Sequence, residues 1–207
     1  ETGSRELHVS RRQFVTDGLY EQVSISNLTD EAVETEVVIS VGSCFDDLFE
    51  VRGMVADVDR MVDTATSDRG LSFTYAPSDI NFRRHVSLKV GGDDPVSVST
   101  RNGTARGDGT LAIDLELDAR ETHSLTIAVT IDGQSEPPAA AVDAAREDVH
   151  DRNRTWQTET SLAHSKDAWD DVLRESRENL LELRQKTEHG PIFSAGVPWF
   201  ATAFGRD

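Results

Sequence analysis

Hydrophobic and polar residues alternate along the first two-thirds of the chain. A period of two places the alternate side chains on one face of a half-buried strand. The alternating segments are residues 23–25, 37–41, 86–90, 96–98, 111–117 and 125–131. Turn-forming residues separate them at 27–30, 91–95, 102–103, 108–109 and 132–133. The pattern predicts a mainly β structure, an antiparallel β-sandwich of many short strands, with no helix before residue 138.

The period changes after residue 133. Residues 134–140, Gln-Ser-Glu-Pro-Pro-Ala-Ala, predict a linker, and residues 141–157 are rich in the helix formers Ala, Arg and Glu. A second helix is predicted over residues 165–187, with Ser165 as its N-cap and His189-Gly190-Pro191 at its end. Its apolar residues at 169, 172, 173, 180 and 181 share one helix face.

The change of period divides the chain into three predicted parts. Residues 1–133 are predicted to form an N-terminal β-sandwich domain, residues 134–164 a linker with the first helix, and residues 165–207 a further helical segment and loop. The chain begins at Glu1, without Met and without a charged-then-apolar signal segment. It ends directly after an apolar, aromatic run, so we expect it to be a piece of a longer protein.

The charge of the chain excludes several classes of function. Twenty-one basic against 38 acidic residues give a net charge of −17, which repels phosphate backbones and argues against nucleic-acid binding. No stretch reaches the roughly 18 apolar residues of a membrane helix. The single cysteine, Cys44, excludes an internal disulfide or a multi-cysteine metal site. The acids are dispersed and lysine is rare, which favours a halophilic, cytoplasmic protein over an ordinary acidic one.

The last twelve residues, Gly-Val-Pro-Trp-Phe-Ala-Thr-Ala-Phe-Gly-Arg-Asp, carry the first candidate chemistry. A Trp and two Phe stand beside a terminal Arg-Asp pair. Sugars need both groups, because an apolar ring face lies on an aromatic side chain while charged groups bind vicinal hydroxyls. The alternative is a core loop in which Arg206 and Asp207 pair with each other.

This segment, residues 196–207, resembles the opening motif of the catalytic barrel in archaeal and bacterial amylo-α-1,6-glucosidases, the glycogen debranching enzymes. Residues 12–21 and 45–53 resemble the N-terminal β-domain of that family. Residues 27–36 match the turn and strand between them. The resemblance implies a β-sandwich followed by a helical segment that begins an (α/α)6 barrel, and it makes residues 165–207 the incomplete start of that barrel.

The resemblance also implies a chemistry. Trp199 would line the sugar pocket, and Arg206 and Asp207 would hydrogen-bond the hydroxyls of the glucosyl unit that is cleaved. The reaction would be inverting hydrolysis of α-glucosidic bonds, in which one carboxylic acid protonates the leaving oxygen and a second carboxylate activates water. Both carboxylates lie downstream of the motif in that family. We therefore assign no catalytic residue and no cofactor here, and expect the chain alone to be inactive.

Two other functions remain open at this stage. The chain could be a non-catalytic carbohydrate-binding β-sandwich module, or part of another sandwich-plus-barrel enzyme such as a trehalase, a glucoamylase-like enzyme or a disaccharide phosphorylase. The expected partners are a glucan or oligosaccharide substrate and, for the β-domain, the catalytic barrel. Neither a nucleic acid nor a membrane is expected as a partner.

A second candidate site lies at residues 44–53, where Asp46, Asp47 and Glu50 could form a catalytic pair or a calcium loop. The alternating ligand spacing of an EF-hand is absent, so a turn with Arg52 paired to an acid is favoured. None of the six histidines has a metal-binding spacing partner. The basic cluster at 83–85 is interpreted as a solvated or acid-paired strand edge and not as a phosphate site. Three glycosylation patterns begin at Asn27, Asn102 and Asn153, and would matter only in an exported protein.

Overall fold

The computed structural model describes residues 6–55, 60–78, 80–101, 107–133, 137–160, 169–188 and 190–196. The chain divides into two compact units. The first comprises residues 1–46 and 57–149, and the second comprises residues 47–56 and 150–207. None of the described helices is both long and apolar enough to cross a membrane.

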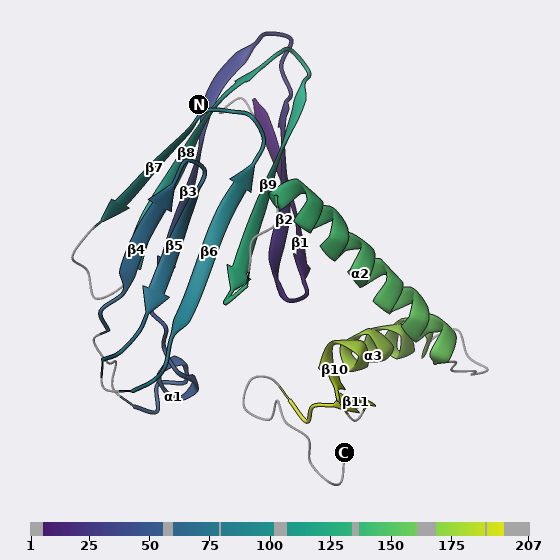
Figure 1. Cartoon of the computed structure of the whole chain (residues 1–207). Coiled ribbons are helices and arrows are strands. Elements are labelled where there is room, and N and C mark those ends of the chain that lie inside the picture. The colour runs from purple at the N-terminus through teal and green to yellow at the C-terminus, as the bar shows by residue number, and fades with distance from the viewer. Residues whose placement is uncertain are drawn as a thin grey trace. The chain divides into compact units, whose positions relative to one another are not determined.

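The first unit contains two antiparallel β-sheets (Figure 1). The larger sheet has the strand order β1-β2-β9-β6-β5-β4, and the smaller one has the order β3-β8-β7. The larger is built from β1 (Leu7–Val15), β2 (Gly18–Asn27), β4 (Asp63–Ser67), β5 (Gly70–Tyr75), β6 (Arg84–Gly91) and β9 (Thr122–Ile131). The smaller is built from β3 (Val33–Ser43), β7 (Val96–Arg101) and β8 (Gly107–Leu117). The predicted mainly β, antiparallel architecture is confirmed.

The core of this unit lies between the two sheets. Strand β8 shows the predicted period of two, because every second residue from Gly107 to Leu117 is buried. The buried apolar residues of this core are Val23, Ile25, Leu71, Phe73, Leu88, Val90, Leu111, Ile113, Leu115, Leu117, Leu125 and Ile127. Burial of such side chains is the main source of stability for a sandwich, at about 1.5–3 kcal/mol for each one.

One predicted turn is part of a strand instead. Asp108 and Gly109 were expected to form a turn but lie within β8. The reason is close packing between the sheets: a Cβ on Gly109 would lie 2.6 Å from Leu71 Cδ1, and one on Gly107 would lie 2.5 Å from Phe73 Cδ1. These glycines make room for large core side chains, a need that the local sequence does not reveal.

The outer face of the three-stranded sheet carries like charges opposite each other. Glu34 of β3 pairs with Glu116 of β8, and Glu36 pairs with Asp114. All four side chains are exposed. Like charges directly across a strand pair destabilise a sheet, by up to about 1 kcal/mol for each pair.

A buried asparagine ties the end of β2 to the start of the β8–β9 connection. Asn27 is 1% exposed. Its Nδ2 donates to the carbonyl oxygens of Glu31 (2.7 Å), Leu117 (3.2 Å) and Asp118 (2.9 Å). Its Oδ1 accepts from the backbone N and the hydroxyl of Thr29 at 2.9 and 2.8 Å. The glycosylation pattern at Asn27 is therefore a structural turn, because the amide nitrogen is buried and engaged.

Helix α2 (Pro138–Glu159) begins on the outer face of the six-stranded sheet. Ala141, Val142 and Ala145 are buried against Tyr20 and Ala128. The first residue of the helix lies close to the end of β6. A Cβ added to Gly91, the last residue of that strand, would lie 3.2 Å from Pro138 Cβ. The helix predicted over residues 141–157 is confirmed, with about a turn added at its start.

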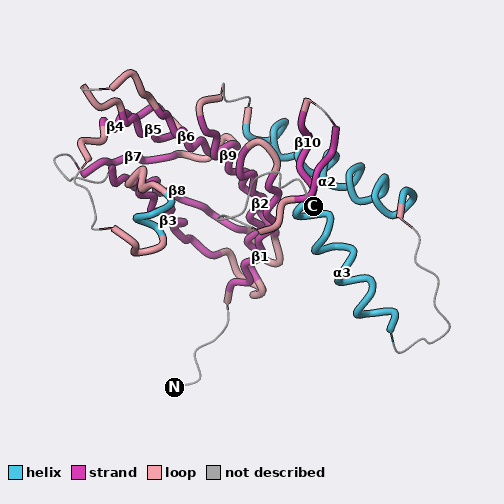
Figure 2. Tube along the Cα trace, turned by 90° about the horizontal axis from the view of Figure 1, so that it is seen from below, coloured by secondary structure: helices cyan, strands magenta, loops and turns pink. Residues whose placement is uncertain are grey.

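The second unit contains α1 (Leu48–Val51), α3 (Asp170–Leu183) and a hairpin of β10 (Arg184–Thr187) and β11 (Gly190–Phe193), which Figure 2 shows with α3 leading into β10. Two predictions need correction here. A one-turn helix, α1, does precede residue 138. The second helix ends at Leu183 rather than near 187, so His189-Gly190-Pro191 belongs to the hairpin and not to a helix end.

The start of the second helix also differs from the prediction. The residue at the N-cap of α3 is Trp169, which makes no side-chain capping hydrogen bond. The predicted N-cap, Ser165, lies outside the described residues. The apolar face is only half buried: Leu181 is buried, whereas Trp169, Val172 and Leu180 are exposed by 55, 51 and 46%.

Candidate functional site

The three predicted sugar-binding residues, Trp199, Arg206 and Asp207, lie outside the described residues. The chain is described up to Gly196. Immediately before that point the chain is held in place within the second unit. Ser194 is buried, and its backbone N donates to the carbonyl of Leu183 at 2.9 Å. The segment that leads into the Gly-Val-Pro-Trp motif therefore starts from an anchored hairpin.

A tryptophan that the sequence pattern did not single out organises this anchor. Trp156 of α2 is 8% exposed, and its Nε1 donates to the carbonyl of Arg177 at 2.8 Å. Phe193 of β11 meets its ring edge to face at a centroid distance of 6.0 Å. Arg184 lies 5.6 Å over the same ring and forms an ion pair with Glu159 at 3.2 Å. The only signal in the sequence is one aromatic residue in the polar second half of the helix, residues 150–159.

The acidic segment at residues 44–53 has structural roles. Asp47 caps α1, because its Oδ1 accepts hydrogen bonds from the backbone N of Phe49 (2.7 Å) and of Glu50 (3.1 Å). The Glu50 carboxylate returns a bond to the backbone N of Asp47 at 2.9 Å, which completes a capping box. Asp46 forms an ion pair with Arg60 at 3.6 Å. Where a turn was predicted, these contacts form one turn of helix.

Two of the described histidines and one arginine of the basic cluster are engaged in pairs. His85 Nδ1 lies 3.0 Å from the Thr74 hydroxyl, and His123 Nε2 lies 3.0 Å from an Asp94 carboxylate oxygen. Arg84 binds Asp132 at 2.9 Å, so of the two predicted alternatives this arginine fits the acid-paired strand edge. Within the described part of the chain, no group of three or more His, Cys, Asp or Glu could hold a metal ion.

Hydroxyl groups shift the pKa of one carboxylate at the β1–β2 turn. Asp17 accepts a hydrogen bond from the Tyr20 hydroxyl at 2.9 Å and one from the Thr16 hydroxyl at 3.0 Å. Both bonds favour the charged form and lower the pKa of Asp17, with the tyrosine as the larger cause. The carboxylate is exposed, so the shift reflects a turn-stabilising contact and not a catalytic acid.

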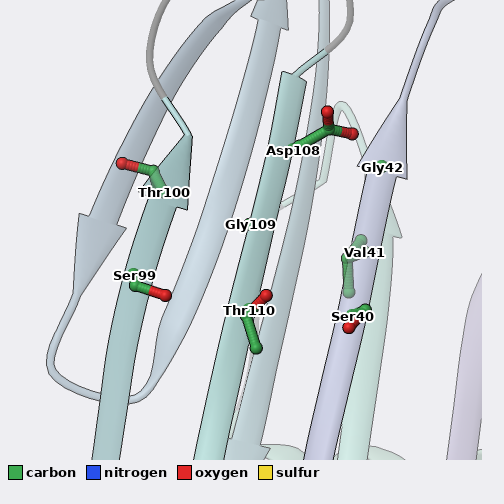
Figure 3. A pocket seen from close by; sticks show the side chains of 8 residues that line it. All are labelled: Ser40, Val41, Gly42, Ser99, Thr100, Asp108, Gly109 and Thr110. Carbon is green, nitrogen blue, oxygen red and sulfur yellow. The ribbon is translucent and has the colours of Figure 1, made fainter.

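A shallow polar hollow lies on the outer face of the three-stranded sheet (Figure 3). The side chains of Ser40, Ser99 and Thr110 come from three adjacent strands at one level, because Thr110 pairs with both Ser40 and Ser99. Asp108 stands at one end, beside Gly42, with which it pairs across the strands. The volume of the hollow is about 460 Å³, and Val41, Thr100 and Gly109 complete its lining.

The hollow offers hydrogen bonds but no stacking surface. Its lining contains three kinds of polar group: serine hydroxyls, threonine hydroxyls and the carboxylate of Asp108. These groups can pair with the hydroxyls of a sugar. None of the lining residues is aromatic. The described sandwich therefore has a surface with the hydrogen-bonding part of the chemistry of a sugar site and without its aromatic part.

Comparison with known proteins identifies the family of the β-unit. A family model described as the N-terminal domain of (some) glycogen debranching enzymes matches residues 2–128. No curated protein sequence matches the chain. A solved structure named as a kojibiose phosphorylase from the human microbiome is similar, with 13% sequence identity and a TM-score of 0.41. The match covers 86% of this chain but only 22% of that protein. The chain therefore belongs to the family of N-terminal domains of glycogen debranching enzymes.

Proposed function

We propose that this chain is the N-terminal part of a glycogen-debranching-type α-glucosidase, which hydrolyses α-glucosidic bonds of glycogen or a related glucan with inversion. The family match over residues 2–128 is the observation that carries this proposal. The match covers more than half of the chain and includes both segments that resemble the family in sequence, at 12–21 and 45–53.

In this proposal the two ends of the chain have different tasks. Trp199 gives the glucosyl unit an apolar face, and Arg206 with Asp207 binds its hydroxyls. The general acid and the general base come from a catalytic domain in the same polypeptide, about 6.5–9.5 Å apart so that water fits between base and sugar. The β-sandwich is a scaffold against which this domain packs.

The anchored hairpin supports the placement of the sugar-binding residues. Trp156, Phe193 and Ser194 fix the chain six residues or fewer before Trp199. A binding residue must be held within about 0.5 Å of its productive position, which a rigid neighbouring element makes possible. The end of β11 thus gives the following motif a fixed starting point.

The test uses the polypeptide encoded by the whole reading frame that contains this chain. We expect it to release glucose from a glycogen limit dextrin, with the β-anomer formed first in NMR spectra. Arg206→Ala should raise KM for the dextrin by at least about tenfold, because a charged hydrogen bond to substrate is lost. Arg152→Ala, an exposed arginine on α2, is the matched control and should change nothing. Activity on trehalose instead of dextrin, or an unchanged KM in Arg206→Ala, would contradict the proposal.

A second candidate function is a carbohydrate-binding β-module, which the hydroxyl-lined hollow favours. The row Ser40, Thr110 and Ser99 with Asp108 could bind the polar edge of a glucan chain. Retardation of the 207-residue chain in a native gel that contains glycogen, abolished by Thr110→Val, would support a module. Unretarded migration would leave the sandwich as a scaffold alone.

We also propose that the enzyme works in a halophilic cytoplasm. A net charge of −17 and the facing carboxylates of β3 and β8 are costly at low ionic strength. At about 1 M salt the Debye length falls to about 3 Å, and this repulsion is screened. Melting temperatures measured from 0.1 to 3 M KCl should rise with salt. A flat profile would refute the halophilic part of the proposal.

A further inference from the structure

A second hollow lies on the outer face of the six-stranded sheet, over β4, β5 and β6, which lie side by side in Figure 1. Leu71 of β5 and Leu88 of β6 belong to the core of the first unit. The period of two therefore puts their neighbours Ser72, Ser87 and Lys89 on the opposite face. The volume of this hollow is about 240 Å³. It is lined by Ala65, Thr66, Ser67, Leu71, Ser72, His85, Ser87, Leu88, Lys89 and Gly133, and we call it the lysine hollow.

Gly70 keeps one end of the lysine hollow open. It pairs with Lys89 of β6 on one side and with Ser67 of β4 on the other. A Cβ on Gly70 would lie 3.2 Å from Lys89 Cγ and 3.1 Å from Ser67 Oγ, so both side chains border the space above the glycine. No side chain fits there, because the same Cβ would lie 2.5 Å from the carbonyl oxygen of Leu88. The backbone therefore keeps the lysine and the serine hydroxyl beside one opening.

A second row of small side chains continues the hollow along the strands. Ser72 pairs with Ala65 on one side and with Ser87 on the other. Ser87 is 8% exposed, and its hydroxyl lies 2.8 Å from that of Thr130, which fixes this wall of the hollow. The hydroxyls of Ser67 and Ser72 make no hydrogen bond with a residue that the structure describes. Both are therefore available to donate to a ligand.

Lys89 carries a charge that no described acid neutralises. It is the one lysine of residues 1–149, it is half-buried, and it forms no ion pair within the described part of the chain. Arginines such as Arg11, Arg84 and Arg120 are paired with acids. A half-buried ammonium loses part of its hydration and gains nothing in return unless an anion binds it. In a chain with 38 acidic residues, this lack of a partner points to a ligand.

His85 lies at the other end of the lysine hollow. Its Nδ1 lies 3.0 Å from the hydroxyl of Thr74, which holds the ring in place. When that hydroxyl donates to Nδ1, the other ring nitrogen, Nε2, carries the proton and can donate to a ligand. His85 precedes Lys89 by four residues of β6, which separates their Cα atoms by about 13 Å. One phosphate group cannot contact both side chains closely, whereas a phosphate with an attached sugar can.

The chemistry of the lining favours an anion over a neutral sugar. No carboxylate lines the lysine hollow, whereas Asp108 lines the hollow of the three-stranded sheet. A lysine ammonium offers three donors and a point charge, which suits the oxygens of a phosphate. The hollow is also smaller than the pockets of about 300–1,000 Å³ that hold drug-sized ligands, so its ligand is small.

We propose that the lysine hollow binds a small phosphate monoester, such as a sugar phosphate. Lys89 and the hydroxyls of Ser67 and Ser72 bind the phosphate oxygens, and His85 contacts the sugar. This site goes beyond the proposed function, because no step of glucan hydrolysis uses it. It lies within the first unit and is independent of the reaction that the whole polypeptide catalyses.

The experiment titrates the 207-residue chain with glucose 6-phosphate, inorganic phosphate and glucose at constant ionic strength. Binding is followed by the backbone amide signals of Ser72 and Ser87 in ¹H–¹⁵N NMR spectra. We expect a Kd of about 1–10 mM for glucose 6-phosphate, because the net charge of −17 weakens the binding of any anion. Inorganic phosphate should bind more weakly, and glucose should leave both signals unchanged.

A pair of variants separates the site from general attraction of anions. Lys89→Gln should weaken the binding of glucose 6-phosphate at least about tenfold, because a charged hydrogen bond is lost. Arg12→Gln is the matched control. Arg12 is exposed, and it lies on the same face of the sheet, because it pairs with Gln22, the neighbour of the core residue Val23. Its replacement removes the same charge outside the hollow and should change the Kd by less than about twofold.

Two further variants test the orientation of the ligand and the folding of the chain. His85→Gln should weaken the binding of glucose 6-phosphate and leave that of inorganic phosphate unchanged. Ser72→Ala should weaken the binding of both, and it replaces Lys89→Gln as the test if that variant does not fold, as judged by circular dichroism.

Four results would overturn the proposal. Signals that stay unchanged up to 50 mM glucose 6-phosphate would exclude the site, and so would an unchanged Kd in Lys89→Gln. Equal weakening by Arg12→Gln would assign the binding to overall charge. Glucose that bound as tightly as glucose 6-phosphate would identify a neutral sugar site, and inorganic phosphate that bound more tightly would identify the free ion as the ligand.

Discussion

Replacement of Asn27 by alanine tests whether one buried amide holds the sandwich together at its turn. The Leu117 carbonyl is buried, and it would lose the amide donor that lies 3.2 Å away. An unsatisfied buried group costs about 1–3 kcal/mol. The hydrogen bonds to the carbonyls of Glu31 and Asp118 are only partly buried. These two carbonyls can hydrogen-bond to water instead, so the loss of the amide there costs less free energy. With the cavity that the amide leaves, we expect Asn27→Ala to lower the free energy of unfolding by about 2–4 kcal/mol.

The matched control is the neighbouring residue. Ser26→Ala removes an exposed hydroxyl pair with Thr122 (2.8 Å) and should cost about 0.5 kcal/mol or less. Urea unfolding at high salt, followed by far-UV circular dichroism, reports the β-unit. The three tryptophans, Trp156, Trp169 and Trp199, all belong to the second unit, so their fluorescence follows that unit separately. A loss below about 1 kcal/mol for Asn27→Ala would refute the reasoning.

Three further outcomes follow from the β-unit. Asp114→Asn removes the repulsion with Glu36, so it should raise the free energy of unfolding at low salt by about 0.2–1 kcal/mol. If the gain persisted in 2 M KCl, where charges are screened, its cause would not be electrostatic. Because hydrogen bonding lowers the pKa of Asp17, the stability that this group contributes is complete above its ordinary pKa near 4 and is lost as the pH falls below that value. Tyr20→Phe should therefore reduce the loss of stability between about pH 4 and pH 2, and an acid unfolding curve of unchanged slope would speak against it. Gly107→Ala places a methyl group 2.5 Å from the ring of Phe73, so the free energy of unfolding should fall by about 1–3 kcal/mol in thermal unfolding. An unchanged melting temperature would show that the two sheets can move apart without cost.

The sequence predicted the strands best where alternation was longest. Strands β8 and β9 were recognised from four apolar residues each, because the pleat of a strand is read directly from a period of two. Strands β1, β4 and β5 gave weaker patterns. Strand β1 lies at the sheet edge, where four charged or polar residues in succession, from Ser10 to Gln13, hide the alternation. Edge strands commonly carry such residues, which prevent pairing with other chains.

Local signals failed where distant segments determine the structure. The turn expected at Asp108-Gly109 is a strand, because a core leucine from another sheet occupies the space beside the glycine. The helix expected to reach residue 187 ends at Leu183, where the chain begins a hairpin that is attached to Trp156 through Phe193. Neither contact is visible within a short window of sequence.

The sequence by itself determined the class of the fold, the charge regime and the family. Alternation, turn residues and short motifs are local, and each is legible without knowledge of what lies opposite. Only the tertiary structure decided the partners of these residues: which sheet each strand joins, that the amide of Asn27 is buried, and that Lys89 and Ser67 lie on either side of Gly70. Such proximity depends on strand order and register, which connect residues more than a hundred positions apart through hydrogen bonds that no local pattern encodes.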